Sequence, residues 1–148
     1  MANPEQVSLL CQGSTAWNTW KWSEDCPQDG PDLSGADLNG LKLDRGVDLE
    51  DTDLSGADLS FATLNGVSLV GANLQDAHLS GVELSADLRS ANLRRANFSG
   101  SNLSFAGLEG ANLCNADLSG ADLAGAYLTG ASLSGAIILG ALIFIELI

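Results

Sequence analysis

One five-residue unit recurs from residue 32 to residue 145 and constrains the fold of the chain more than any other feature. Two of its clearest copies read Ala-Asp-Leu-Ser-Gly and Ala-Asp-Leu-Ala-Gly, at residues 116–120 and 121–125. The central position is Leu, or in three units Phe or Ile, and it recurs in steps of five from Leu33 to Leu43, from Leu49 to Leu84 and from Leu88 to Ile143. A chain built from 23 copies of one unit leaves little room for a unique catalytic site.

A period of five fits neither an α-helix, which repeats every 3.6 residues, nor a long strand, which repeats every two. Within one unit, however, the central residue and the residue two places before it share a side, as in a very short strand. Thirteen of the 17 glycines fall two places after the central residue, where a tight turn needs a positive φ. An amphipathic helix is disfavoured, because each glycine would cost it about 1 kcal/mol. The pattern predicts four units per square coil, with Ala and Leu pointing inward and the coils stacked as a solenoid.

These repeats resemble the pentapeptide-repeat family, whose motif is Ala-(Asp/Asn)-Leu-x-x, over residues 32–145. The resemblance implies an all-β solenoid, namely a right-handed quadrilateral β-helix of about six coils. We expect two parts: an N-terminal cap and linker at residues 1–31, and the β-helix at residues 32–148. The period shifts twice, with one residue extra at residues 44–46 and one missing at residues 85–86. Both shifts are interpreted as altered corners of the coil, comparable to β-bulges.

The N-terminal segment is expected to be a helix that covers the first coil, since an open solenoid end exposes apolar core and strand edges. Asn3, Pro4 and Gln6 form a helix-start pattern with a capping box. A single helix from about Pro4 to Lys21 would place its apolar residues on one flank. These cap residues are Val7, Leu10, Trp17 and Trp20. The segment is similar to a helix that precedes the repeats in some cyanobacterial members of the family. A binding role for its tryptophans is the alternative to capping.

The C-terminal coil shows the opposite pattern, because its outward positions become apolar. The predicted interface residues are Ile137, Leu139, Leu142, Phe144, Ile145 and Leu147. This run is too short and too often interrupted by Gly and Ala for a membrane span. It predicts an uncapped end that pairs with a second copy of the chain or lies beneath a partner.

Acidic charge raises the alternative of a DNA-mimicking inhibitor of an enzyme such as gyrase, as the resemblance to acidic gyrase-binding family members implies. The formal net charge is −13, but residues 32–88 carry 11 acidic and 2 basic residues and residues 89–148 carry 4 and 3. B-DNA has about one charge per 1.7 Å, so a rod of roughly 28 Å would need about 16 along its whole length. The asymmetry disfavours mimicry, and the net charge disfavours nucleic-acid binding. Arg89, Arg94 and Arg95 are interpreted as a solvated corner.

The three cysteines suggest one bridge and one free thiol. Cys11 and Cys26 lie on either side of the predicted helix end and are a candidate disulfide, whereas Cys114 points outward alone. No Cys/His set has zinc-ligand spacing, and we expect no cofactor. The first four residues lack the basic region and apolar core of a signal peptide, which predicts a cytoplasmic protein, where a disulfide would be unusual.

No catalytic constellation is recognisable. His78 is the single histidine, and it is expected to be a surface residue near Asp58, on a face shared with Asp37 and Asp117. Phe98 is expected to point inward, and Phe61, Phe105 and Tyr127 outward. The sequence therefore predicts a non-enzymatic protein-interaction or structural module whose partner is unknown.

Overall fold

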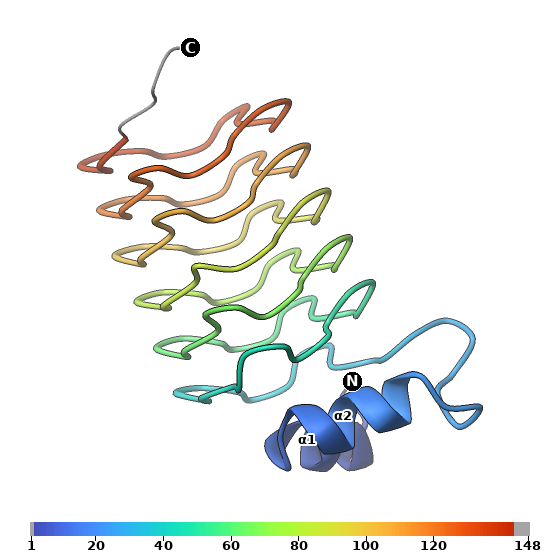
Figure 1. Cartoon of the computed structure of the whole chain (residues 1–148). Coiled ribbons are helices and arrows are strands. Elements are labelled where there is room, and N and C mark those ends of the chain that lie inside the picture. The colour runs from blue at the N-terminus through green and yellow to red at the C-terminus, as the bar shows by residue number, and fades with distance from the viewer. Residues whose placement is uncertain (1, 144–148) are drawn as a thin grey trace.

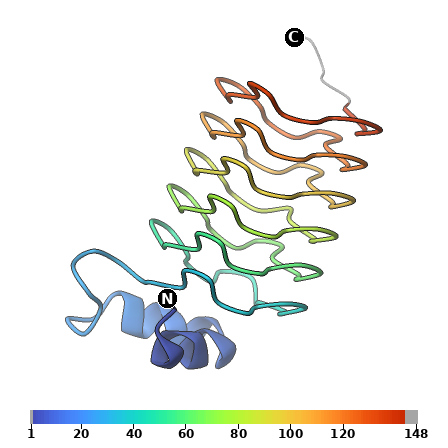
Figure 2. The ribbon, with the colours of Figure 1, turned by 180° about the vertical axis from the view of Figure 1, so that it is seen from behind.

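The computed structural model describes residues 2–143, which form a square coil of stacked turns with two helices at its N-terminal end (Figure 1). Each side of a coil is a strand so short that it contributes one bridge residue, and every bridge is parallel. The chain forms a right-handed quadrilateral β-helix, as predicted. Figure 2 shows from behind that the coils stack along one axis, with the helices covering one end only.

The outward strand residues form four ladders, which define four faces of the rod. The first face carries Asp32, Asp53, Asn73, Asn92, Asn112 and Ser132. The second carries Asp37, Asp58, His78, Asn97, Asp117 and Ile137. The third carries Lys42, Thr63, Glu83, Asn102, Asp122 and Leu142, and the fourth carries Asp48, Ser68, Asp87, Gly107 and Tyr127.

The interior of the coil is almost entirely apolar. Leucines at the central positions and small residues two places earlier are buried from Leu33 to Leu123. Phe98 is fully buried in the ladder position between Leu79 and Leu118, which confirms the predicted register. Each coil buries its apolar side chains against the coils before and after it, so the rod has one continuous core.

The corners have a left-handed residue two places after the central leucine, as the glycine pattern predicts. The turn amide bonds back to that leucine, as in the 3.1 Å bond from Ala57 N to Leu54 O. Gly56 occupies this position with φ +64°, a conformation that costs glycine little. Seven corners use another residue at this position with φ between 54° and 60°, among them Phe61 and Phe105. A bulky residue in this region is a conformational outlier.

Both shifts of period appear as changes of ladder spacing. Bridged residues are 21 apart across the extra residue, as in Asp32 and Asp53, and 19 apart across the missing one, as in Ser68 and Asp87. At the shortened corner, side chains supply the local hydrogen bonds. Asn65 Oδ1 accepts from Ser85 N at 2.8 Å, and the Ser85 hydroxyl donates to Ser104 O at 2.8 Å.

The cap consists of two helices, α1 (Pro4–Cys11) and α2 (Ser14–Lys21), so the prediction of one continuous helix is wrong. Gly13 separates them with φ 99° and ψ −179°, which ends the helical path. Asn3 does cap α1, accepting from Glu5 N at 2.9 Å. The predicted capping box is also wrong, because the buried Gln6 instead accepts from Asp32 N at 2.7 Å.

The cap closes the first coil through core packing and through hydrogen bonds that replace a missing coil. Leu10 and Trp17 are fully buried, and Val7 and Trp20 pack beside them. The Asn18 amide donates to Gly46 O at 2.8 Å and accepts from Asp48 N at 3.0 Å, as a neighbouring strand would. The extra residue of the first coil thus lies in the corner on which α2 docks.

Candidate interaction surfaces

The C-terminal coil gathers six of the ten exposed large hydrophobic residues of the described chain, from Leu133 to Ile143. Ile137, Leu139 and Leu142 are exposed, Leu139 by 78%. Phe144, Ile145 and Leu147 of the predicted interface lie outside the described residues. The described part of the chain offers no further coil to accept hydrogen bonds from the amides of Leu133 and Ile138.

Three residues of this end were missed by sequence reasoning. Leu133, Ile138 and Ile143 occupy central positions, which the repeat pattern assigns to the core, yet all three are exposed. A central residue is buried only when the next coil covers it, and no described residue follows this coil. The five-residue pattern carries no signal for this exposure, because it is the same in covered and uncovered coils. The apolar end is therefore wider than the outward positions alone predict.

The acidic side chains of the faces brace the corners that follow them. Asp53 Oδ1 accepts from Ser55 N at 3.0 Å, and the same bond recurs at Asp58, at Asp117 and at the asparagines of the ladders. The hydroxyl and backbone N–H of Ser60 lower the pKa of Asp58, and those of Ser119 lower the pKa of Asp117. These aspartates thus have a structural role in the corners of the fold.

The second face carries His78 between Asp58 and Asn97, as the sequence predicts, with the imidazole exposed. Asp37 and Asp117 lie on the same face. Within residues 2–143 no group of three or more His, Cys, Asp or Glu side chains is placed to hold a metal ion. Two of the three arginines in the predicted basic corner are ion-paired, Arg89 with Asp87 at 2.7 Å and Arg95 with Asp76 at 2.6 Å.

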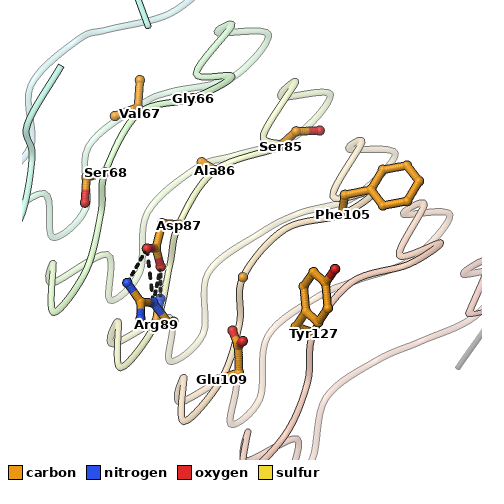
Figure 3. A pocket seen from close by; sticks show the side chains of 11 residues that line it. Gly66, Val67, Ser68, Ser85, Ala86, Asp87, Arg89, Phe105, Glu109 and Tyr127 are labelled. Carbon is orange, nitrogen blue, oxygen red and sulfur yellow. Dashed lines mark hydrogen bonds and ion pairs between the residues drawn. The ribbon is translucent and has the colours of Figure 1, made fainter. Parts of the chain in front are cut away.

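Three aromatic side chains point outward, as predicted: Phe61, Phe105 and Tyr127. Phe61 lies over Gly81 at one corner, and Phe105 lies over Gly125 at another. Phe105 and Tyr127 border a hollow of about 470 Å³ on the fourth face (Figure 3). Small residues of consecutive coils line it, among them Ala86 at the shortened corner and Gly107 in the next coil.

The cap presents a smaller surface of its own. Trp22, just beyond α2, is 73% exposed, whereas the predicted cap residue Trp20 stacks at 5.2 Å from Trp17. Lys21 pairs with Asp48 and donates to Glu50 O at 2.6 Å, which fixes the end of α2 against the rod. The exposed aromatic residue of the cap is therefore Trp22, which the sequence analysis did not single out.

The structure places all three cysteines as free thiols, and the bridge between Cys11 and Cys26 stays a prediction for the thiol count below. Cys11 ends α1 and is exposed, while Cys26 is half-buried in the turn after α2, where its amide bonds to Ser23 O at 3.3 Å. Burial raises the pKa of Cys26, although Lys21 opposes the effect. Cys114 is free, as predicted, but is half-buried, with Sγ 3.1 Å from Ser132 Oγ.

Thiol titration is expected to find three reactive cysteines per denatured chain. The protein would be purified without reductant and denatured without reductant, because a bridge would then survive. The expected count is three, since none of the cysteines is paired. A count of one would instead show that one disulfide is present, and peptide mapping would then decide whether it joins Cys11 to Cys26.

Comparison with known proteins identifies the repeats. The family described as pentapeptide repeats matches residues 32–69, 45–81, 84–120 and 106–141, in eight copies. A pentapeptide repeat protein from the Arabidopsis thaliana thylakoid lumen is 32% identical, with a TM-score of 0.58, over 67% of this chain and 66% of that one. A pentapeptide repeat protein from Nostoc PCC 7120 is 36% identical, with a TM-score of 0.58, over 69% of this chain and 84% of that one.

A third similar structure is HetL, a pentapeptide repeat protein involved in heterocyst differentiation regulation in Nostoc sp. strain PCC 7120. It is 32% identical over 82% of this chain and 73% of that one, with a TM-score of 0.36. The chain spans just under two thirds of the Arabidopsis structure. No protein of curated function matches the chain. Among residues 2–143 no helix is both long and apolar enough to cross a membrane.

Proposed function

The chain belongs to the pentapeptide-repeat family, and we propose that it is a non-enzymatic module that binds proteins through the surface of its rod and self-associates through its C-terminal coil. The cap closes the N-terminal end, so the two ends of the rod differ. The residues proposed for self-association are Ile137, Leu139 and Leu142, with Phe144, Ile145 and Leu147 following them in the sequence.

The exposed C-terminal coil is the observation that carries this proposal. Its outward and central positions are both apolar and both open to solvent, from Leu133 to Ile143. Large exposed apolar patches on soluble proteins mark interaction sites. A two-fold contact between two such ends would cover both patches and pair both strand edges at once, and two-fold dimers are the commonest oligomers. The cap helices would then lie at the far ends of a longer rod.

Sedimentation equilibrium is expected to give a dimer of the intact chain, and a monomer when Leu139 and Leu142 are both replaced by glutamate. Each replacement puts a carboxylate in the proposed contact. Because burying a charge without a partner is costly, the two subunits should separate. Phe61→Asn is the matched control, because Phe61 is an exposed apolar residue far from the C-terminal coil. It should leave the dimer intact. A wild-type chain that stays monomeric at high concentration refutes self-association.

Inhibition of gyrase by duplex mimicry is the alternative, and a supercoiling assay is expected to show no inhibition. The carboxylates are concentrated in residues 32–88, and the C-terminal half is close to neutral. A duplex mimic needs charge along its whole length. Inhibition that disappears in Asp37→Asn/Asp58→Asn, two neighbours on the second face, would instead support mimicry.

The absence of enzymatic activity and a cytoplasmic location belong to the same proposal. The repeats fill the chain with one structural unit, and several aspartates of the faces brace corners or form ion pairs. Disulfides are rare in the cytoplasm, so the three cysteines are expected to stay reduced there.

A further inference from the structure

The fourth face has a gap in its ladder of side chains, at Gly107. All other outward strand positions from residue 32 to residue 142 carry a side chain, and this one lies between Asp87 and Tyr127. The backbone does not require glycine here, because φ of Gly107 lies outside the left-handed range. The missing side chain therefore opens the hollow rather than serving a turn (Figure 3).

Carboxylates converge on this gap. A Cβ atom at Gly107 would lie 3.3 Å from Glu109 Oε2 and 3.5 Å from Asp87 Oδ1. Arg89 engages Asp87, with its Nε 2.9 Å from Oδ1. Glu109 Oε2 is buried and has no hydrogen-bond partner among the described residues. A buried carboxylate oxygen without a partner is unfavourable, so the hollow has capacity for one more cationic donor.

Aromatic rings stand at the edge of the same hollow. Phe105 is 71% exposed at the preceding corner, and Tyr127 is 59% exposed on the ladder itself. Phe105 has φ +60°, where glycine or asparagine would fit without the conformational cost of a bulky side chain. The ring packs over Gly125 of the next coil, as Phe61 packs over Gly81, and its exposed side borders the hollow.

We propose that this hollow binds a lysine or arginine side chain from an extended segment of a partner protein. The cationic head would take the place of the missing side chain at Gly107 and pair with the Glu109 carboxylate, while its aliphatic stem and charge contact Tyr127 and Phe105. Charge complementarity identifies the occupant as a cation. The hollow has two carboxylates, those of Asp87 and Glu109, but only one guanidinium, that of Arg89. Its rim is aromatic, which suits the aliphatic stem of a lysine or arginine. Ladder positions from Ser68 to Tyr127 span roughly 14 Å, enough for about four extended residues.

The proposal deepens the role as an interaction module by giving the chemistry of a partner. It concerns a site separate from the C-terminal coil, so the sedimentation test and the test below can fail independently. The cap docks on Asp48, at the start of the fourth face, and contributes no residue to the lining of the hollow.

Fluorescence anisotropy with three labelled peptides tests the proposal on the full chain. The peptides are seven residues of serine and threonine with a central lysine, arginine or glutamine. The lysine and arginine peptides are expected to bind, and the glutamine peptide to bind at least about tenfold more weakly. Glu109→Gln should weaken the cationic peptides about tenfold. Gly107→Asn should also weaken the cationic peptides about tenfold, because its side chain would fill the gap. Asparagine is chosen because Asn92 and Asn112 occupy equivalent ladder positions on the first face.

Two matched variants separate the hollow from the general acidity of the rod. Glu83→Gln removes one carboxylate from the third face, and Phe61→Asn removes an aromatic residue from a different corner. Both should leave binding unchanged, whereas Phe105→Asn should weaken it several-fold without loss of stability. Equal effects of Glu83→Gln and Glu109→Gln would show nonspecific attraction and overturn the proposal. Equal binding of the glutamine peptide, or no binding of any peptide at millimolar protein, would also overturn it.

Discussion

Replacing Phe98 with alanine is expected to lower the free energy of unfolding by about 3–5 kcal/mol, the usual cost of removing a buried aromatic ring. Phe98 is fully buried in a middle coil, and its amide donates to Asp117 O at 2.7 Å. The loss of the ring leaves a cavity between two coils, and the neighbouring strands limit how far the site can collapse. Because each coil is stabilised by its neighbours, a cavity here weakens the contacts on both sides of it.

Urea unfolding followed by circular dichroism measures this loss. Phe98→Leu is the informative control, because leucine fills the same position in most other units. It should cost less than about half as much as alanine. A loss below about 1 kcal/mol for Phe98→Ala would contradict the register after the shortened corner, since only an exposed ring could be removed so cheaply.

Replacing Trp17 with alanine is expected to cost about 3–5 kcal/mol and to release the cap from the first coil. The indole is fully buried, and its Nε1 donates to Asp48 O at 2.6 Å. The substitution removes the largest side chain of the cap core and leaves a carbonyl oxygen without its donor. Without the cap, the first coil exposes its apolar interior and its strand edges.

The matched control is Trp22→Ala, a tryptophan five residues away that is 73% exposed. Its removal should change the free energy of unfolding by no more than about 0.5 kcal/mol. Amide hydrogen exchange distinguishes local from global effects. Trp17→Ala should raise exchange most in the first coil, at Asp48 and Leu49, and least in the coils near Phe98. Equal losses for the two tryptophans would contradict the docking of α2.

Features that recur in every repeat unit were the ones that the sequence predicted correctly. The repeat pattern predicted a corner at Gly56 and a core position at Leu54, and the structure has both. The outward direction of Phe105 and Tyr127 also followed from position within the unit. Each of these predictions needed only the local five-residue pattern, because a solenoid repeats the same surroundings in every coil.

Features that occur once were not predictable in the same way. The cap was expected as one helix with Gln6 in a capping box, yet Gln6 reaches Asp32 and Gly13 separates α1 from α2. The exposure of Ile138 follows from the lack of a described coil beyond it rather than from its position in the unit. The hollow at Gly107 needs three residues that only the coil brings together: Asp87, Glu109 and Tyr127.

The sequence by itself determined the coil, its core and the direction of nearly every repeat side chain, because period and residue type act within a few residues. The tertiary structure alone decided how the ends are closed and which side chains from different coils share a surface. Residues about 20 positions apart become neighbours only through stacking, and a shift of one residue at Ser85 changes which side chains meet across the ladder. Asp48 shows both kinds of information. Its position within the repeat can be read from the neighbouring residues, but its contacts with Trp17, Asn18 and Lys21 depend on where the cap docks.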